Sequence, residues 1–136
     1  MDNVYKELYY RWMSRTLKWF ILMKTNVIVK LQVDGLHCWP AARDMFKEVA
    51  YLSDPHRHVF HIECKKEVFH DDRDVEFIMF KHEVKKYFGK YYKPELGMCD
   101  FGSMSCEMIA KELLEKFDCL SVTVSEDNEN GAIVYK

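Results

Sequence analysis

Two histidines, His56 and His58, lie two residues apart at the start of an alternating segment. Side chains alternate between the two faces of a β-strand, so both imidazoles are expected on one face, together with Phe60, Ile62 and Cys64. The segment therefore predicts a strand whose inward face is apolar and which carries two imidazoles at its end. Two imidazoles on one face can bind one metal ion if a third ligand converges on them.

A third histidine, His37, follows another alternating segment, residues 26–34. If the extended run continues past Gly35, parity places His37 in the apolar row of that strand. Three histidines leave the fourth position of a zinc ion open, as in catalytic sites, where the ion lowers the pKa of a bound water or polarises a carbonyl. Alternatively, each of the three is a structural or surface residue. The remaining histidines fail the test of parity or location and are expected to be solvated: His61, His70 and His82.

A carboxylate, Glu126, ends a third inward row that contains Leu120, Val122 and Val124. Either the strand has left the core at this point, or the carboxylate accepts two parallel N–H donors from a planar heterocycle. A second carboxylate, Glu107, is explained as an acidic residue in the first turn of a helix.

The five cysteines are an odd number and include no C-x-x-C pair. They are expected to be reduced thiols of an intracellular, cytoplasmic protein. Cys38 is the thiol nearest the histidine set, but it alternates to the face opposite His37 and is interpreted as a packing residue. The sequence contains no Gly-rich phosphate loop, G-x-S-x-G elbow or H-E-x-x-H motif.

The elements that position these residues follow the order strand, strand, helix, helix, strand, strand. The strands are expected at residues 26–34, 56–69, 120–126 and 132–135, and the helices at 75–92 and 105–117. Two helices between two strand pairs predict an α+β fold (ββααββ), a four-stranded antiparallel sheet with both helices on one face. The connection from Trp39 to Asp54 has helical character, and Ser103 or Ser105 is expected to cap the second helix.

Residues 1–24 are expected to form a helical extension before one domain at residues 25–136, whose pattern begins just after Met23. Such a helix packs on the domain, extends from it without fixed order, or binds a partner or a membrane surface. The chain has no apolar run of membrane-spanning length and a net charge of −2, so neither nucleic acid nor a membrane is expected as a partner. The amphipathic pattern consists of Val4, Leu8, Trp12, Trp19 and Phe20, with Arg11, Arg15 and Lys18 between them.

The order and spacing of five segments resemble the 6-pyruvoyl-tetrahydropterin synthase and 6-carboxy-tetrahydropterin synthase family. The resemblance covers about residues 26–136. The segments are 35–42 (GLHCWPAA), 56–60 (HRHVF, similar to H-G-H-x-Y), 74–77 (DVEF), 105–110 (SCEMIA, similar to T-x-E-N-hydrophobic-Ala) and 122–126 (VTVSE, similar to V-x-V-x-E).

The resemblance implies the tunnelling fold, in which subunits join their sheets into a barrel with active sites between them. It implies zinc bound by His37, His56 and His58, and a pterin-like base bound through its 2-amino-pyrimidinone edge by Glu126, with Glu107 as a further ligand-binding residue. It also implies a homo-oligomer, a trimer or hexamer, that acts as a zinc-dependent lyase. The ligand would be a pterin or deazapurine precursor such as dihydroneopterin triphosphate, as in pterin or queuosine biosynthesis.

The sequence departs from the family pattern where the family has its proton-moving residues. Residues 39–55 contain no cysteine, and the segment that corresponds to the family's Leu-Asp-His reads LGMCD at residues 96–100. Cys38, Cys99 and Asp100 are the remaining candidates for a catalytic group. The alternatives to a lyase are a non-catalytic tunnelling-fold protein that binds a pterin- or purine-like ligand, and an interaction protein with a structural zinc site.

Overall fold

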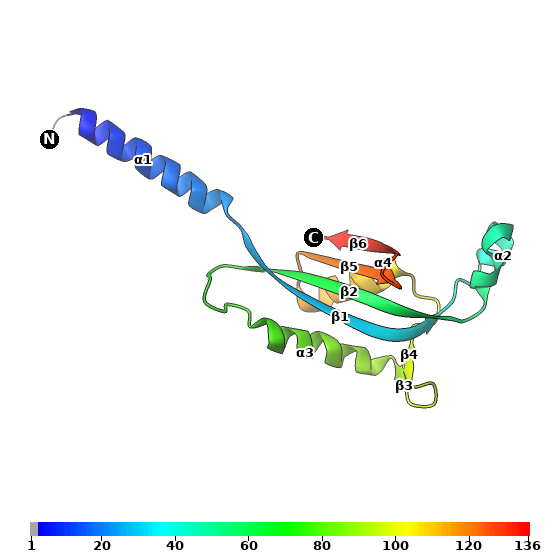
Figure 1. The fold of residues 1–136 in the computed structure, drawn as a ribbon. Coiled ribbons are helices and arrows are strands. Elements are labelled where there is room, and N and C mark those ends of the chain that lie inside the picture. The colour runs from blue at the N-terminus through cyan, green and yellow to red at the C-terminus, as the bar shows by residue number, and fades with distance from the viewer. Residues whose placement is uncertain (1–2) are drawn as a thin grey trace.

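The computed structural model describes residues 3–136, apart from the side chains of residues 18–22. A six-stranded sheet with the order β3-β4-β1-β2-β5-β6 forms the body of the molecule (Figure 1). The strands are β1 (Thr25–His37), β2 (His56–Val68), β3 (Tyr92–Lys93), β4 (Met98–Asp100), β5 (Ser121–Glu126) and β6 (Asn130–Tyr135). The helices are α1 (Asn3–Leu22), α2 (Ala42–Met45), α3 (Phe77–Tyr87) and α4 (Cys106–Phe117), with 3₁₀-helices η1 (Lys47–Ser53) and η2 (Phe88–Lys90).

The two longest strands, β1 and β2, are antiparallel partners over their full 13 residues each. In this register His37 lies opposite His56, and Gly35 lies opposite His58. The extended run of β1 therefore continues past Gly35. This was the condition under which His37 was predicted to join the apolar row of the strand. A side chain at position 35 would collide with the Phe101 ring, which lies 2.5 Å from the site of a Cβ.

One apolar core lies between the sheet and the helices α3 and α4. Buried side chains from β1, β2 and β5 form one face of the sheet and contact Phe80 and Val84 of α3 and Ile109 and Leu113 of α4. Helices α3 and α4 therefore cover the same face of the sheet, as predicted. The N-cap of α4 is one of the two predicted serines, because Ser105 Oγ accepts a hydrogen bond from the Met108 amide.

The predicted antiparallel strands β1, β2, β5 and β6 are present, and two short strands extend the sheet. β3 and β4 form a small antiparallel pair, and β4 also pairs in parallel with the end of β1. Strands of two and three residues are too short to show an alternating pattern. The predicted helix at residues 75–92 is also divided, because α3 ends at Tyr87 and η2 follows it.

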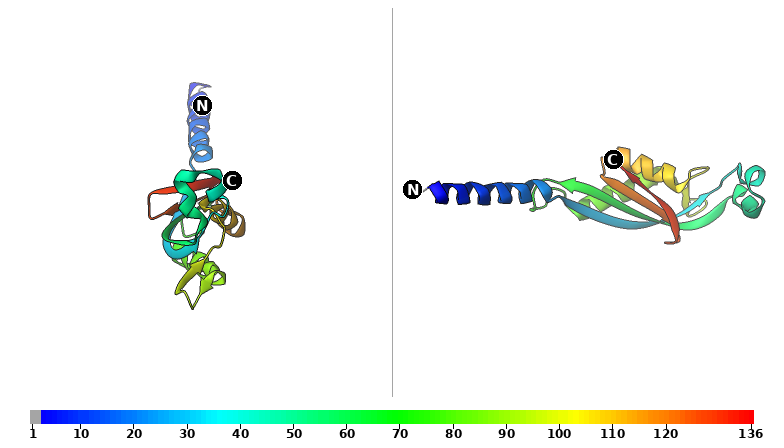
Figure 2. Two further views of the ribbon diagram at one scale, coloured as in Figure 1. Left: turned by 90° about the vertical axis from the view of Figure 1, so that its right-hand side faces the viewer. Right: turned by 90° about the horizontal axis from the view of Figure 1, so that it is seen from above.

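The N-terminal helix α1 projects beyond the end of the sheet, roughly in line with the long strands (Figure 2). Its side chains from residue 3 to residue 17 are exposed except for Thr16, which is half-buried. The side chains of Lys18, Trp19 and Phe20, which belong to the amphipathic pattern of the sequence, lie outside the described residues. Among the helices that the structure describes, none has the length and apolar character needed to cross a membrane.

Candidate metal centre and adjoining cavity

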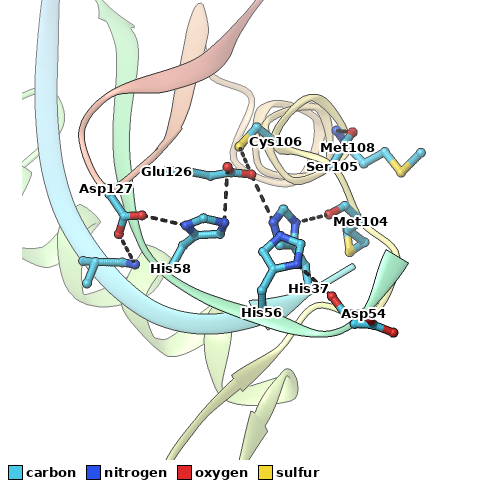
Figure 3. Close-up of polar contacts among 11 residues, drawn as sticks. His37, Asp54, His56, His58, Met104, Ser105, Cys106, Met108, Glu126 and Asp127 are labelled. Carbon is cyan, nitrogen blue, oxygen red and sulfur yellow. Dashed lines mark hydrogen bonds and ion pairs between the residues drawn. The ribbon is translucent and has the colours of Figure 1, made fainter. Parts of the chain in front are cut away.

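The three histidines predicted from strand parity meet at one end of the β1–β2 pair (Figure 3). The ring centroid of His37 lies 4.6 Å from that of His56 and 5.2 Å from that of His58, and the latter two are 5.0 Å apart. One possible ligand atom from each ring lies within 4.8 Å of the other two. The alternation of two neighbouring strands thus brings His37 together with two histidines that lie about twenty positions later in the chain.

In each ring the Nδ1 atom is held by an oxygen that can only accept a hydrogen bond. The partners are the Met104 carbonyl for His37 (2.9 Å), the Asp54 carbonyl for His56 (2.8 Å) and Asp127 Oδ2 for His58 (2.6 Å). Each Nδ1 must therefore donate and carry the proton. The lone pair of the neutral ring is then on Nε2, so second-shell contacts prepare this atom for a metal.

Two of these Nε2 atoms are buried and face a second acceptor. His37 Nε2 lies 3.1 Å from Glu126 Oε1 and His58 Nε2 lies 3.4 Å from Glu126 Oε2, within ion-pair distance. Neither Nε2 meets the angular requirements of a hydrogen bond, although the two side chains are only 10% and 19% exposed. The lone pairs of a neutral imidazole and a carboxylate repel each other unless a cation lies between them. The residues therefore fit a bound cation, and three imidazoles suit zinc.

Asp127, which was not among the sequence-predicted site residues, supports this arrangement. It follows Glu126 with a left-handed φ of 54°, and its Oδ1 accepts a hydrogen bond from the Val59 amide at 2.9 Å. Hydrogen bonds from His58 and from the Val59 amide lower the pKa of the Asp127 carboxyl, which stays charged. Its position directly after the strand that pairs with β2 was the available sequence signal. The carbonyls of Asp54 and Met104 are backbone groups and have no such signal.

A cavity of about 370 Å³ adjoins the histidines, a size typical of small-molecule sites. Its wall includes the metal candidates His37 and His56 and the carboxylate residues Glu126 and Glu107. The apolar part of the wall contains Trp39, Leu52, Met104 and Met108. The structure therefore brings both sequence-predicted carboxylate residues, from α4 and β5, to the same cavity as the histidines.

Cys106, the first residue of α4, is a cavity residue that the sequence reasoning did not single out. Its Sγ lies 3.7 Å from Glu126 Oε1, and the side chain is buried. Burial, followed by the charge and the hydrogen bond of Glu126, raises the pKa of the Cys106 thiol to about 12. The thiol is therefore neutral and donates to Glu126. Spacing of three and four from Ile109 and Ala110 was the signal that Cys106 faces inward.

Only one of the three sequence candidates for a catalytic group lines the cavity, and this is Cys38, which is half-buried. Cys99 lies in the core with its thiol 3.6 Å from the Phe88 carbonyl oxygen, and burial raises its pKa. Asp100 is exposed and accepts a hydrogen bond from the Gly102 amide at 2.9 Å. All five cysteines are free thiols.

No protein-family model and no curated protein matches the sequence of this chain. Its structure is similar to that of the 6-pyruvoyl tetrahydropterin synthase of Caenorhabditis elegans, with a TM-score of 0.64. The match has 12% sequence identity and covers 84% of this chain and 96% of that chain. At this identity the likeness shows the fold alone. The fold is the tunnelling fold, an α+β architecture with a mostly antiparallel sheet.

Proposed function

We propose that the protein binds zinc and acts, in the manner of 6-pyruvoyl- and 6-carboxy-tetrahydropterin synthases, on a pterin or deazapurine precursor similar to dihydroneopterin triphosphate. The observation that carries the proposal is the convergence of three histidines whose Nδ1 atoms are all satisfied, next to a cavity. His37, His56 and His58 would hold the metal. When bound, zinc supplies Lewis-acid chemistry beside the ligand.

Glu126 is the proposed anchor for the heterocycle, and Glu107 is a second ligand-binding residue. The Glu126 carboxylate lines the cavity and lies beside His37, His58 and the Cys106 thiol. Two carboxylate oxygens match the two parallel N–H donors of a 2-amino-pyrimidinone edge. The apolar wall that includes Trp39 and Met108 suits the faces of a planar ring.

The second candidate function is ligand binding without catalysis. A lyase of this type needs a side chain that moves protons near the ligand. Cys99 and Asp100 lie outside the cavity wall, and the Cys106 thiol is buried, neutral and engaged with Glu126. These placements favour a non-catalytic protein that binds a pterin- or purine-like ligand. If the protein is a lyase, Cys38 is the remaining candidate for the side chain that moves protons.

Metal analysis of the purified protein tests the shared part of both proposals. We expect about one zinc per chain, and loss of zinc in His58→Ala, because two imidazoles alone bind zinc weakly. His61→Ala is the matched control, since His61 lies on the same strand but belongs to the opposite face. A zinc content below about one per three chains, or equal zinc in both variants, would contradict a metal site at these histidines.

Incubation of zinc-loaded protein with dihydroneopterin triphosphate separates the two candidates. Formation of product that depends on Cys38, tested with Cys38→Ala, supports the lyase. Binding of the intact compound without turnover supports the binding protein, and that binding should be lost in Glu126→Gln. A ligand that neither binds nor reacts contradicts both proposals while the zinc result stands by itself.

A further inference from the structure

The helix α1 has two faces of different chemistry. Residues spaced by three and four, as on one side of an α-helix, form an apolar face that consists of Tyr5, Leu8, Tyr9 and Trp12. Each of these side chains is between 56% and 67% exposed. The opposite side carries Glu7, Arg11 and Ser14, and Arg15, seven residues after Leu8, lies at the margin of the apolar face. The described part of the molecule thus contains an exposed amphipathic helix whose apolar face has no partner.

Charge is distributed unevenly between this helix and the rest of the chain. Residues 1–24 contain five basic and two acidic side chains, a net charge of +3, whereas the whole chain has −2, which leaves −5 for residues 25–136. Among the side chains that the structure describes, Arg43, Arg57 and Arg73 form ion pairs, and neither Arg11 nor Arg15 does. Arg11 and Arg15 therefore present unpaired positive charge on a helix that projects from an acidic domain (Figure 2).

These features fit the surface of a membrane with anionic lipids. Three of the four residues of the apolar face are tyrosine or tryptophan, whose amphipathic rings favour the boundary between lipid and water. A helix in this boundary buries its apolar face and keeps its basic side chains near the lipid headgroups. Anionic headgroups complement the charge of the helix and repel the acidic domain, so the domain would remain in the water phase.

We propose that α1 binds the surface of an anionic membrane, where it lies in the interface without crossing the bilayer. This departs from the expectation of no membrane partner, because the net charge of −2 for the whole chain conceals the basic character of residues 1–24. The proposal goes beyond the zinc and ligand site, because it concerns residues that do not contact the cavity. It would hold a ligand-binding protein at a lipid surface through one helix. Its partner is defined by chemistry: a bilayer with negatively charged headgroups.

The test is co-sedimentation of the full chain with vesicles. We expect binding to vesicles of phosphatidylcholine with phosphatidylglycerol, weak binding to phosphatidylcholine alone, and weaker binding at high salt. Leu8→Glu with Trp12→Glu should abolish binding. Arg11→Glu with Arg15→Glu should weaken binding roughly 10-fold or more, because each basic residue contributes to attraction by the surface. Lys85→Glu with Lys86→Glu reverses two exposed charges on α3 and should leave binding unchanged.

The same variants decide against the proposal in three ways. Absence of binding to any vesicle overturns it, and so does equal binding to neutral and anionic vesicles. Self-association of the chain that the Leu8→Glu and Trp12→Glu pair abolishes would mean that a second copy covers the apolar face, which also overturns it. Zinc content and circular dichroism of each variant show that the domain is folded, so that loss of binding reports on α1.

Discussion

The contact of His58 with Asp127 determines which of its ring nitrogens is left for a metal. Asp127 Oδ2 accepts the Nδ1 proton at 2.6 Å, which leaves Nε2 free for zinc. We therefore predict that Asp127→Ala weakens zinc binding about 10- to 100-fold, as the loss of second-shell partners does elsewhere. Competition with a chelating dye measures the affinity. Asp100→Ala, which removes an exposed carboxylate outside the cavity, is the control, and equal affinities of the two variants would contradict the role of Asp127.

The buried thiol of Cys106 should react slowly with alkylating reagents. Its pKa is raised to about 12 by burial and by Glu126, so little thiolate exists near neutral pH. We predict that iodoacetamide at pH 8 modifies Cys38, which is half-buried, before Cys106, and that alkylation of Cys106 accelerates as the pH rises. Peptide mass mapping after short reaction times measures both sites. Modification of Cys106 at the rate of Cys38 would show that its thiol is accessible and ionised.

For single residues, the alternation of side chains predicted the positions of His37, His56, His58 and Glu126, because parity along a strand decides which face of the sheet a residue occupies. It did not predict Asp127, since a residue after a strand can point in many directions until the turn geometry is known. The support from the Met104 carbonyl also could not be foreseen, because backbone acceptors have no sequence signature.

The course of β1 depends on a glycine at the start of its short pairing with β4, where Gly35 lies beside Cys99. A Cβ at Gly35 would lie 2.5 Å and 2.7 Å from atoms of the buried Phe101 ring and 3.1 Å from Phe60. We predict that Gly35→Ala lowers the free energy of unfolding by about 1–3 kcal/mol, because a packed core accommodates an extra methyl group poorly. Urea denaturation measures this change. Gly89→Ala is the control, since nothing lies within 4 Å of its Cβ position, and an equal effect of the two would reject the packing argument.

A cluster of polar side chains joins the end of α3 and the segment after it to α4. Glu112 of α4 accepts hydrogen bonds from Tyr87 and, at 2.7 Å and 2.6 Å, from Tyr91, and it pairs with Lys90. Burial alone would raise the pKa of Glu112, but hydrogen bonds from Lys90, Tyr87 and Tyr91 outweigh it and lower the pKa. The stabilisation is therefore present above the pKa of an unfolded glutamate and is lost as the pH falls through the lower, folded value.

We accordingly predict that Glu112→Gln lowers the free energy of unfolding by about 1–2 kcal/mol at pH 7, and by less at pH 3, which lies below the pKa of an unfolded glutamate, so that part of the stabilisation is already lost. Urea titrations at the two pH values measure the difference. Glu115→Gln changes an exposed residue of the same helix and serves as the control. A cost for Glu112→Gln that is the same at both pH values would contradict the assignment of charged hydrogen bonds.

The long elements could be predicted from sequence because each repeats its pattern several times, as β2 and α4 do. The short strands β3 and β4 could not, since their pairing depends on the position of β1, which is distant in sequence. The early end of α3 at Tyr87 has a similar cause. Tyr91 follows the 3₁₀-helix η2 and donates a hydrogen bond to the Glu112 carboxylate. This contact between distant residues cannot be predicted from helical spacing alone.

At the scale of the whole molecule, the sheet has two edge strands, β3 and β6. Within the described residues, each of them has a neighbouring strand on one side only. Exposed edges of this kind favour pairing between chains. We predict that the protein forms a homo-oligomer of three or six 16.3-kDa chains, as the resemblance to tunnelling-fold enzymes implies. Light scattering coupled to size-exclusion chromatography measures the mass. A single species with the mass of one chain would contradict this assembly.

The full-length pairing of β1 with β2 also bears on how the chain folds. Their apolar rows repeat every two residues, so a slip of two positions would keep the same side chains inside and would change the pattern of buried surface little. The two ends of the pair are not equivalent, because only the native register sets His37 opposite His56 and Gly35 opposite His58. A metal ion that requires all three imidazoles at once would stabilise this register and no other. Zinc would then select the correct strand alignment during folding, before any ligand reaches the cavity.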